Sequence, residues 1–173
     1  MSKTVLKKYL LSLQKEQIIE KVLELYINYK PVKEYFTFYL NPDEKGIFEK
    51  YKAVIVNEFY PKTKSFNPKT RFSVAKKAIA DFSKLNPSPE LIGDLMVTFV
   101  ENACQFTFDF GDMWEQYYDS TATNFNQTLK FLHKNNLLVN FKLRMEKCVK
   151  YAEPCGYGFA DEISDLFHDY YGD

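Results

Sequence analysis

A strongly apolar segment covers residues 88–108 and has the sequence SPELIGDLMVTFVENACQFTF. Its start carries the signals of a helix N-terminus: Ser88 suits the N-cap, Pro89 suits the first turn, and Glu90 favours the positive end of the helix dipole. At about 100° per residue, apolar side chains then share one broad face, namely Leu91, Ile92, Leu95, Met96, Phe99, Ala103 and Phe106. A helix this apolar is normally buried over most of its circumference, so the segment is predicted to be the central core helix.

Size and composition are those of an ordinary globular protein. The chain has 173 residues, of which 46% are hydrophobic and 27% are charged, which is enough for one domain with a proper core. No apolar run approaches the roughly 20 residues of a membrane span, and the N-terminus lacks the apolar block of a signal peptide. The odd number and the spacing of Cys104, Cys148 and Cys155 argue against a disulfide framework and a cysteine-based zinc site. We therefore expect a single helical domain over residues 1–173, in the cytoplasm and without membrane contact.

Charge is divided unevenly along the chain, although the net charge is zero. Residues 1–85 contain 17 Lys and Arg against 9 Asp and Glu, so this half is basic. Residues 86–173 contain 6 against 14, so this half is acidic. Such a division is compatible with a basic binding face, with two parts of one domain that attract each other, or with an antiparallel dimer. The two structural explanations are favoured over the binding face.

The rest of the chain alternates helical periodicity with caps and prolines, and it contains no convincing strand pattern. The expected boundaries are caps at Ser2 and Ser12, a start at Pro31, an end at Asn41-Pro42, a helix over 43–60, a start at Asn67-Pro68, and helices over 120–134, over 137–151 and at the C-terminus. Short turns join these segments. The sequence therefore predicts an all-α domain of about nine short helices, arranged as an α–α superhelix or as an irregular multi-helix bundle around the central helix.

Several segments spread along the chain resemble one protein family. They are KEQIIE at 15–20, VKEYF at 32–36, LNP at 40–42, AKKAI at 75–79, DF at 81–82, PSP at 87–89 and GYGFAD at 156–161. The family that they resemble consists of small all-helical bacterial proteins of unknown function. Because the similar segments extend over nearly the whole chain, the resemblance implies one intact helical domain in a bacterial cytoplasm. No activity comes with the family, so no functional residue is carried over.

Acidic and aromatic side chains gather just after the central helix. We call them the acidic–aromatic cluster, which consists of Asp109, Asp112, Glu115, Asp119, Trp114, Tyr117 and Tyr118. The last carbonyls of a helix are the negative end of its dipole, so the added carboxylates require a cation, a basic neighbour or open water. Carboxylates beside rings can bind cations, sugars or metal-bound phosphates, but they can also cap and solubilise helix starts. The cluster is the candidate ligand site, and its alternative role is an N-cap by Asp109 or Asp112 for a short helix through Trp114.

A basic segment interleaved with aromatic rings precedes the central helix. Its cations are Lys62, Lys64, Lys69, Arg71, Lys76 and Lys77, and its rings are Phe66 and Phe72. This mixture is typical of a surface that binds single-stranded nucleic acid. However, Phe72 falls on the apolar face of its predicted helix, and a pI near 6.7 argues against a dedicated nucleic-acid binder. Nucleic-acid binding is therefore the third hypothesis, behind protein binding and ligand binding.

The chain contains no recognised catalytic or cofactor motif. It has neither a Ser-His-Asp motif nor His-Glu-x-x-His, and the glycines at 156–158 lack the spacing and the preceding strand of a phosphate loop. No cofactor and no metal site are assigned. Aromatics make up 17% of the residues, and so many rings need either a large core or a surface that binds something. We therefore predict a non-catalytic helical module that binds a protein partner or a second copy of itself.

Overall fold

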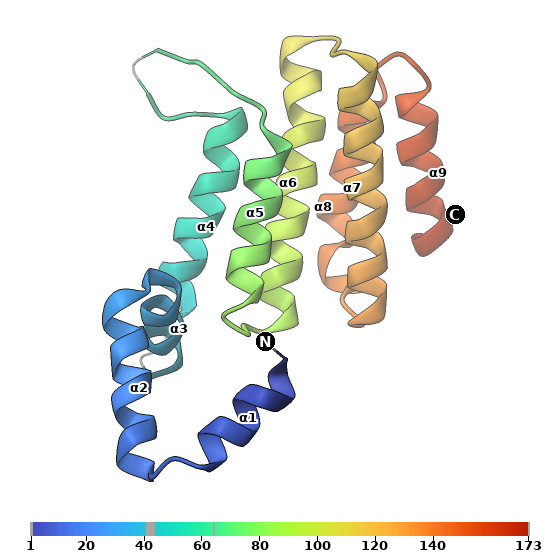
Figure 1. Ribbon diagram of the computed structural model, residues 1–173. Coiled ribbons are helices and arrows are strands. Elements are labelled where there is room, and N and C mark those ends of the chain that lie inside the picture. The colour runs from blue at the N-terminus through green and yellow to red at the C-terminus, as the bar shows by residue number, and fades with distance from the viewer. Residues whose placement is uncertain (1, 41–43, 64, 173) are drawn as a thin grey trace. The chain divides into compact units, whose positions relative to one another are not determined.

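The computed structural model describes residues 2–40, 44–63 and 65–172 (Figure 1). These residues form nine α-helices and no strand, so the predicted all-α class and the predicted number of helices are confirmed. By packing, the chain divides into two compact units, Met1–Glu44 and Lys45–Asp173. A single domain over the whole chain stays a prediction. Within the described ranges, no helix has the length and apolarity that crossing a membrane requires.

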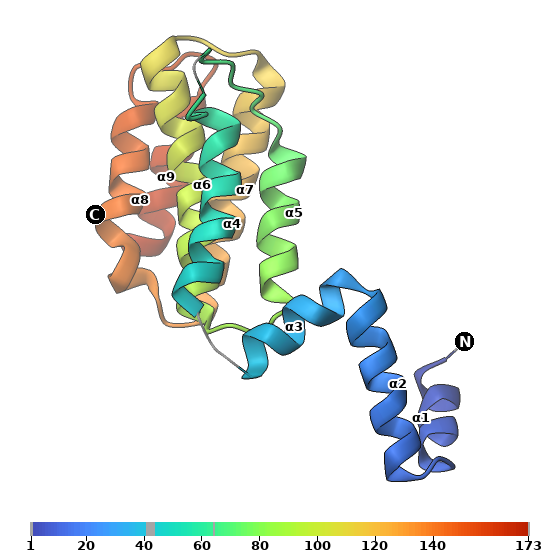
Figure 2. The ribbon, with the colours of Figure 1, turned by 90° about the vertical axis from the view of Figure 1, so that its left-hand side faces the viewer.

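The first unit contains α1 (Lys3–Leu11), α2 (Lys15–Asn28) and α3 (Lys30–Leu40), and α2 packs against α3 (Figure 2). Ser2 caps α1 as predicted, because its hydroxyl accepts a hydrogen bond from the backbone N–H of Val5. Pro31 is the second residue of α3, close to the predicted start of that helix. The predicted end at Asn41-Pro42 lies outside the described residues.

The predicted cap of α2 at Ser12 is wrong. The Ser12 hydroxyl donates to the carbonyl of Tyr9, so Ser12 satisfies the last turn of α1 and does not open the next helix. The N-cap of α2 is Gln14, whose backbone N–H donates to the side chain of Gln17 at 2.9 Å. A short polar side chain can serve either end of a helix, and the position of the turn between the helices decided which.

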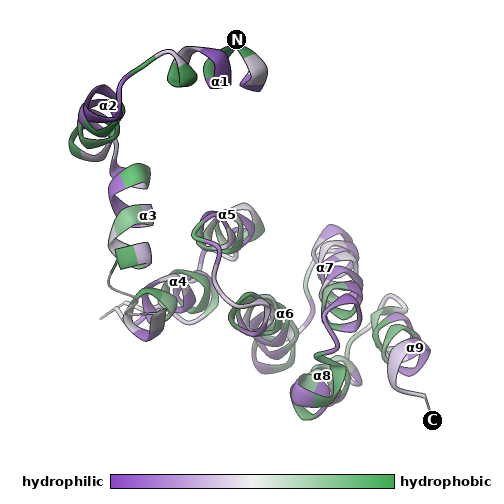
Figure 3. Cartoon of the chain, turned by 90° about the horizontal axis from the view of Figure 1, so that it is seen from below, coloured by the Kyte–Doolittle hydropathy of each residue, from purple (hydrophilic) through white to green (hydrophobic). Residues whose placement is uncertain are grey.

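The second unit is a two-layer stack of helix pairs. It holds nearly all of α4 (Glu44–Phe59), together with α5 (Phe72–Ser83), α6 (Pro89–Phe110), α7 (Glu115–Lys134), α8 (Leu138–Ala152) and α9 (Phe159–Tyr171). The helices of each consecutive pair, α4–α5, α6–α7 and α8–α9, run in opposite directions (Figure 1). Seen end-on, α4, α6 and α8 form one layer, and α5, α7 and α9 form the other (Figure 3). This stacking of helical hairpins is the superhelix-like arrangement that the sequence predicts as one of two alternatives.

The helix α6 is the central helix of this unit, as predicted. The Ser88 hydroxyl accepts a hydrogen bond from the N–H of Leu91, and Pro89 is the first helical residue. Gly111 ends the helix with a φ of +88°, in the region that favours glycine. Ten residues of α6 are buried, because α5, α7 and α8 each cover a part of its wide apolar face. The side chains without any exposed surface are Leu95, Val97, Val100 and Cys104.

The helix α5 begins later than the sequence predicts. A cap and a first-turn proline are expected at 67–68, whereas α5 starts at Phe72. The cause is Glu58 near the end of α4, whose backbone carbonyl accepts from the N–H of Thr70 at 2.8 Å and whose carboxylate accepts from Arg71. These bonds hold the chain in a non-helical path up to Arg71. A partner distant in sequence therefore overrides the local capping signal.

The helix α7 begins earlier than the sequence predicts. A helix is expected from residue 120, but α7 starts at Glu115, and Trp114 is its N-cap without a capping side chain. The predicted short helix through Trp114 and its N-cap by Asp109 or Asp112 are therefore wrong. Asp109 lies inside the last turn of α6, and Asp112 accepts a hydrogen bond from the hydroxyl of Tyr118. Gly111 separates the end of α6 from the start of α7.

Candidate functional site

The acidic–aromatic cluster lies at the end of the second unit where α6 leads into α7 (Figure 1). Tyr118 organises its buried side, because its hydroxyl donates to the Asp112 carboxylate at 3.0 Å and accepts from the N–H of Met113 at 3.0 Å. The hydroxyl of Thr107 lies 3.0 Å from the same oxygen. Burial is the main cause that raises the pKa of Tyr118, so the phenol stays protonated. Tyr118 therefore ties the connection between α6 and α7 to the end of α6.

Two further members of the cluster are bonded to neighbouring elements. The Tyr117 hydroxyl donates to the carbonyl of Ala103 at 2.9 Å, and burial raises the pKa of Tyr117. Asp109 accepts from the hydroxyl of Tyr60 at 2.8 Å, and burial together with this bond raises the pKa of Tyr60. Asp109 also accepts from the side chain of Gln105 at 3.3 Å. These contacts join α6, α7 and Tyr60, the residue that follows α4, at one end of the unit.

The remaining members of the cluster point to solvent. Glu115, Asp119 and Trp114 are exposed, and the Trp114 ring contacts the edge of the Tyr117 ring with centroids 5.5 Å apart. Nowhere in residues 2–40, 44–63 and 65–172 do three His, Cys, Asp or Glu side chains gather as a metal site would need. The structure thus pairs Asp112 with Tyr118 and Trp114 with Tyr117. Ligand binding by the whole cluster stays a prediction.

Most cations of the predicted nucleic-acid segment lie among the described residues of the second unit, and two of them form ion pairs with carboxylates. Arg71 forms an ion pair with Glu58 at 2.8 Å, and Lys77 forms one with Asp81 at 2.7 Å. The ring of Phe72 packs against the ring of Phe99, with centroids 5.0 Å apart. Lys64 lies outside the described residues, and Lys62, Lys69 and Lys76 are exposed. Nucleic-acid binding by this segment stays a prediction.

A network of charged side chains between α6 and α8 has no counterpart among the sequence-based predictions. The half-buried Arg144 of α8 donates to Asp94, Glu101 and Thr98 on α6. The two carboxylates favour the charged guanidinium and raise the pKa of Arg144, although burial opposes them. Asp94 and Glu101 are seven residues apart and so share one helix face, which is the signal that could have revealed the network. The arrangement links two helices of the core by charge-assisted hydrogen bonds.

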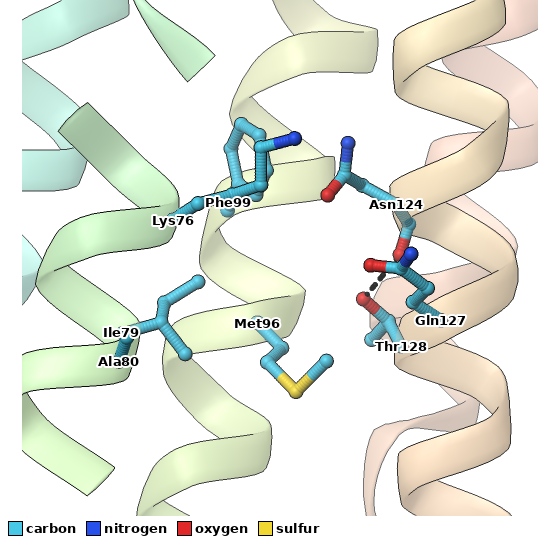
Figure 4. A pocket seen from close by; sticks show the side chains of 8 residues that line it. All are labelled: Lys76, Ile79, Ala80, Met96, Phe99, Asn124, Gln127 and Thr128. Atoms are coloured by element: carbon cyan, nitrogen blue, oxygen red, sulfur yellow. Dashed lines mark hydrogen bonds between the residues drawn. The ribbon is translucent and has the colours of Figure 1, made fainter. Parts of the chain in front are cut away.

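A groove opens between α5 and α7 above α6, and its volume is about 240 Å³ (Figure 4). In the same layer α7 packs closely against α9, whereas α5 and α7 have no comparable contact and each packs against α6 instead. The groove is lined by Lys76 and Ile79 from α5, Met96 and Phe99 from α6, and Asn124 and Gln127 from α7. Its floor is therefore apolar, its α5 wall is apolar except for Lys76, and its α7 wall is polar.

The polar wall on α7 is satisfied within its own helix. The Asn124 side chain donates to the carbonyl of Ser120, and the Thr128 hydroxyl donates to the carbonyl of Asn124 at 2.8 Å (Figure 4). Because these side chains bond back to α7, they do not bridge to α5. Sequence reasoning did not identify this groove, since the spacing between two helices leaves no local pattern.

The helices of the first unit cover few of that unit's own apolar side chains. Within residues 2–40, Phe38 is the one buried side chain, and twelve large apolar side chains are exposed. A shallow apolar groove of about 480 Å³ lies between α2 and α3, with Leu23 and Tyr26 on one side and Phe36 and Leu40 on the other. Leu23 is 53% exposed although it lines this groove.

A comparison with protein families matches residues 1–155 to a Family of unknown function (DUF6155). The chain belongs to this family. The matched residues include every segment on which the sequence resemblance rests except GYGFAD at 156–161, and α9 lies beyond them. No curated protein and no solved structure matches the chain. Membership of the DUF6155 family therefore adds no activity to the geometry described above.

Proposed function

We propose that this member of the family is a non-catalytic helical module that binds a protein through the apolar side of its first unit. One observation carries the proposal: within residues 2–40, twelve large apolar side chains are exposed and only Phe38 is buried. Short amphipathic helices gain most of their stability from packing of the apolar face. A partner that covers this face would supply that packing.

The size of the exposed surface supports a protein partner. From typical side-chain areas, the twelve residues present on the order of 1,000 Å² of largely apolar surface. A standard interface buries about 800 Å² on each side, so the exposed apolar side chains of α1, α2 and α3 are numerous enough to supply one. Four of the twelve residues are tyrosines, a residue type enriched at interfaces: Tyr9, Tyr29, Tyr35 and Tyr39.

Only some charges of the first unit are paired within it. Lys21 pairs with Glu24 at 2.9 Å, and Lys30 pairs with Glu34 at 3.7 Å. Residues 2–40 contain seven Lys against four Glu, so the surface around the apolar side chains is basic. Binding should weaken only in part at high salt, because screening acts on exposed charges and leaves apolar burial in place.

Light scattering coupled to size-exclusion chromatography tests the proposal on the full chain. Wild type should self-associate as its concentration rises or should capture a protein from lysate. Leu23→Glu combined with Leu40→Glu should abolish either event, because both side chains line the α2–α3 groove. The control is Leu143→Glu, which puts the same charge on an exposed apolar position of α8 in the second unit. A wild type that stays monomeric and captures nothing contradicts the proposal.

Isotope-labelled cross-linking identifies what covers the surface. Unlabelled and ¹⁵N-labelled chains are mixed and cross-linked through lysines of the first unit such as Lys21 and Lys33. Cross-links of mixed mass indicate a second copy, and cross-links to another protein indicate a hetero-partner. If residues 2–40 cross-link only within their own chain, the apolar surface is internal and the proposal fails.

Ligand binding at the acidic–aromatic cluster is the second candidate function. The observation in its favour is that Trp114 is exposed, as are the carboxylates of Asp112, Glu115 and Asp119, which lie close to it in the sequence. Trp114 is the only tryptophan, so its emission reports on this site directly. Wild type should respond to divalent, cationic or sugar ligands with a change in emission and a higher melting temperature. A flat titration, or an equal response in Asp112→Asn with Glu115→Gln, eliminates this candidate.

We also propose that the protein works in a bacterial cytoplasm. The sequence resemblance supports this location, as does the odd number of cysteines, which argues against a secreted disulfide framework. Fractionation of the cells that contain the protein is the direct test, and recovery in a membrane or secreted fraction would contradict it.

A further inference from the structure

We propose that the groove between α5 and α7 binds a small amphipathic carboxylate, with its apolar part on Met96 and Phe99 and its carboxylate at Lys76. This site is separate from the surface proposed above, because all of its residues lie in the second unit. Its size, its apolar floor and one unpaired cation carry the inference.

The floor of the groove fits an apolar group. Phe99 is almost fully buried, and Met96 and Ile79 are half-buried beside it. A volume of about 240 Å³ is below the usual range for drug-sized ligands. At about 30 Å³ for each water, it corresponds to roughly eight waters, so the ligand has about eight to ten non-hydrogen atoms. Benzoate and hexanoate are carboxylates of this size.

The charge at the rim favours an anion. Lys76 points from α5 across the groove toward α7 (Figure 4). No carboxylate in the described part of the chain lies within ion-pair distance of Lys76, whereas the adjacent Lys77 is paired with Asp81 at 2.7 Å. No lining residue of the groove is acidic. A carboxylate at the rim would therefore meet a positive charge without any competing negative one.

The opposite wall supplies polar groups, with Asn124 at the height of the Lys76 ammonium and Gln127 below it (Figure 4). Gln127 is exposed on α7, and its carboxamide has donors for a second contact to a carboxylate. The Asn124 side chain is buried in the wall, and its amide nitrogen is already used by Ser120. The ligand would thus be held between Lys76 and Gln127, with its apolar end directed down toward α6. This is the usual composition of a small-molecule site, an apolar cleft with a few converging polar groups.

The test is a titration of the full chain, labelled with ¹³C at the methionine methyl groups, with benzoate in an NMR experiment. Met96 lines the groove, while Met145 is fully buried in α8 and serves as the internal control. The Met96 methyl signal should shift to saturation with a Kd on the order of 1 mM, and Met145 should not move. Neutral benzyl alcohol should bind several-fold more weakly.

Matched lysine variants test the charge. Lys76→Gln should weaken benzoate binding about three- to fivefold, as expected for one solvent-exposed ion pair, and Lys77→Gln should leave it unchanged. Ala80→Phe should block the groove and remove the Met96 response whatever the charge. The inference is overturned if Met96 shows no saturable shift, if Lys76→Gln binds as wild type does, or if benzyl alcohol binds equally well. It is also overturned if the Met96 signal depends on protein concentration without benzoate, because a second copy then occupies the groove.

Discussion

The helices α1 and α6 begin with the same kind of cap but differ in how far they are buried. Ser2 and Ser88 each accept a hydrogen bond from the backbone N–H three residues ahead, and both distances are 3.4 Å. Yet α1 buries no residue, whereas α6 buries ten. The same local signal therefore starts a helix in both units, and burial separates the central helix of a core from a helix whose side chains stay exposed.

The two units differ in their polar contacts as well. In the second unit, polar bonds join elements distant in sequence, such as Glu58 to Arg71 and Arg144 to the carboxylates of α6. In the first unit, the described ion pairs join residues three or four positions apart on one helix, as in Lys21–Glu24. Such local pairs on an exposed face contribute little to stability. The comparison therefore predicts large mutational effects in one unit and small effects in the other.

The two units should differ most in the free energy of unfolding that is lost when one leucine in each is replaced by alanine. Leu95→Ala in α6 should lower the free energy of unfolding by about 2–5 kcal/mol, because the side chain has no exposed surface and leaves a cavity. Leu23→Ala in α2 should stay within about 0.5 kcal/mol of wild type. Both are measured by denaturant melts followed by far-ultraviolet circular dichroism, which reports on the helices of both units. Equal losses would show that the side chain of Leu23 is as well covered as that of Leu95.

The next largest effect is expected at Arg144. Replacing it in Arg144→Met should cost about 1–3 kcal/mol, because Asp94 and Glu101 then lose the bonds from Arg144 in a partly buried position and keep only their pairs with Lys52 and Lys147. Lys21→Met is the control in the first unit, where both partners are exposed, and it should give no measurable change. A loss at Arg144 that disappears at high salt would identify the network as a surface feature.

Glu58→Gln should have a smaller, pH-dependent effect of about 1–2 kcal/mol, since Glu58 is buried but Arg71 is exposed. The side-chain bond from Arg71 lowers the pKa of Glu58 below its ordinary value. As pH falls, the unfolded chain takes up this proton first, so the stabilisation is complete above about pH 4.3 and disappears as pH falls through the lower folded-state pKa. Denaturant melts from pH 7 to pH 3 should therefore show the difference from wild type shrinking at acid pH, while Glu34→Gln shows none.

The smallest effects should come from the two helix caps. Ser88→Ala should lower the free energy of unfolding by about 0.5–1 kcal/mol, because α6 unfolds together with the core. Ser2→Ala should leave the Trp114 melt unchanged and should only speed amide exchange in α1, since that helix frays independently. An equal shift of the melt by both substitutions would mean that α1 and the second unit unfold as one cooperative body.

The acidic–aromatic cluster was only partly predictable. The sequence places its carboxylates and rings after the central helix, and the structure keeps Trp114 and Glu115 exposed there. The sequence does not reveal that the hydroxyl of Tyr118 bonds to Asp112 or that the hydroxyl of Tyr60 bonds to Asp109. Those partners are side chains whose positions depend on how α7 and α4 pack against α6. The residue types near a helix end therefore indicate where a site could lie, but they do not predict which side chains form hydrogen bonds there.

What the sequence determined by itself is the set of helices and the identity of the central one. The periodicity of α6, its cap at Ser88 and its end at Gly111 are local properties, because an α-helix is built from contacts three and four residues apart. The tertiary structure alone decided the start of α5, which depends on the distant Glu58. It also decided which apolar faces are covered and where α5 and α7 leave a groove. Burial and the spacing between helices depend on how two helices pack together, so the periodicity of a single helix does not predict them.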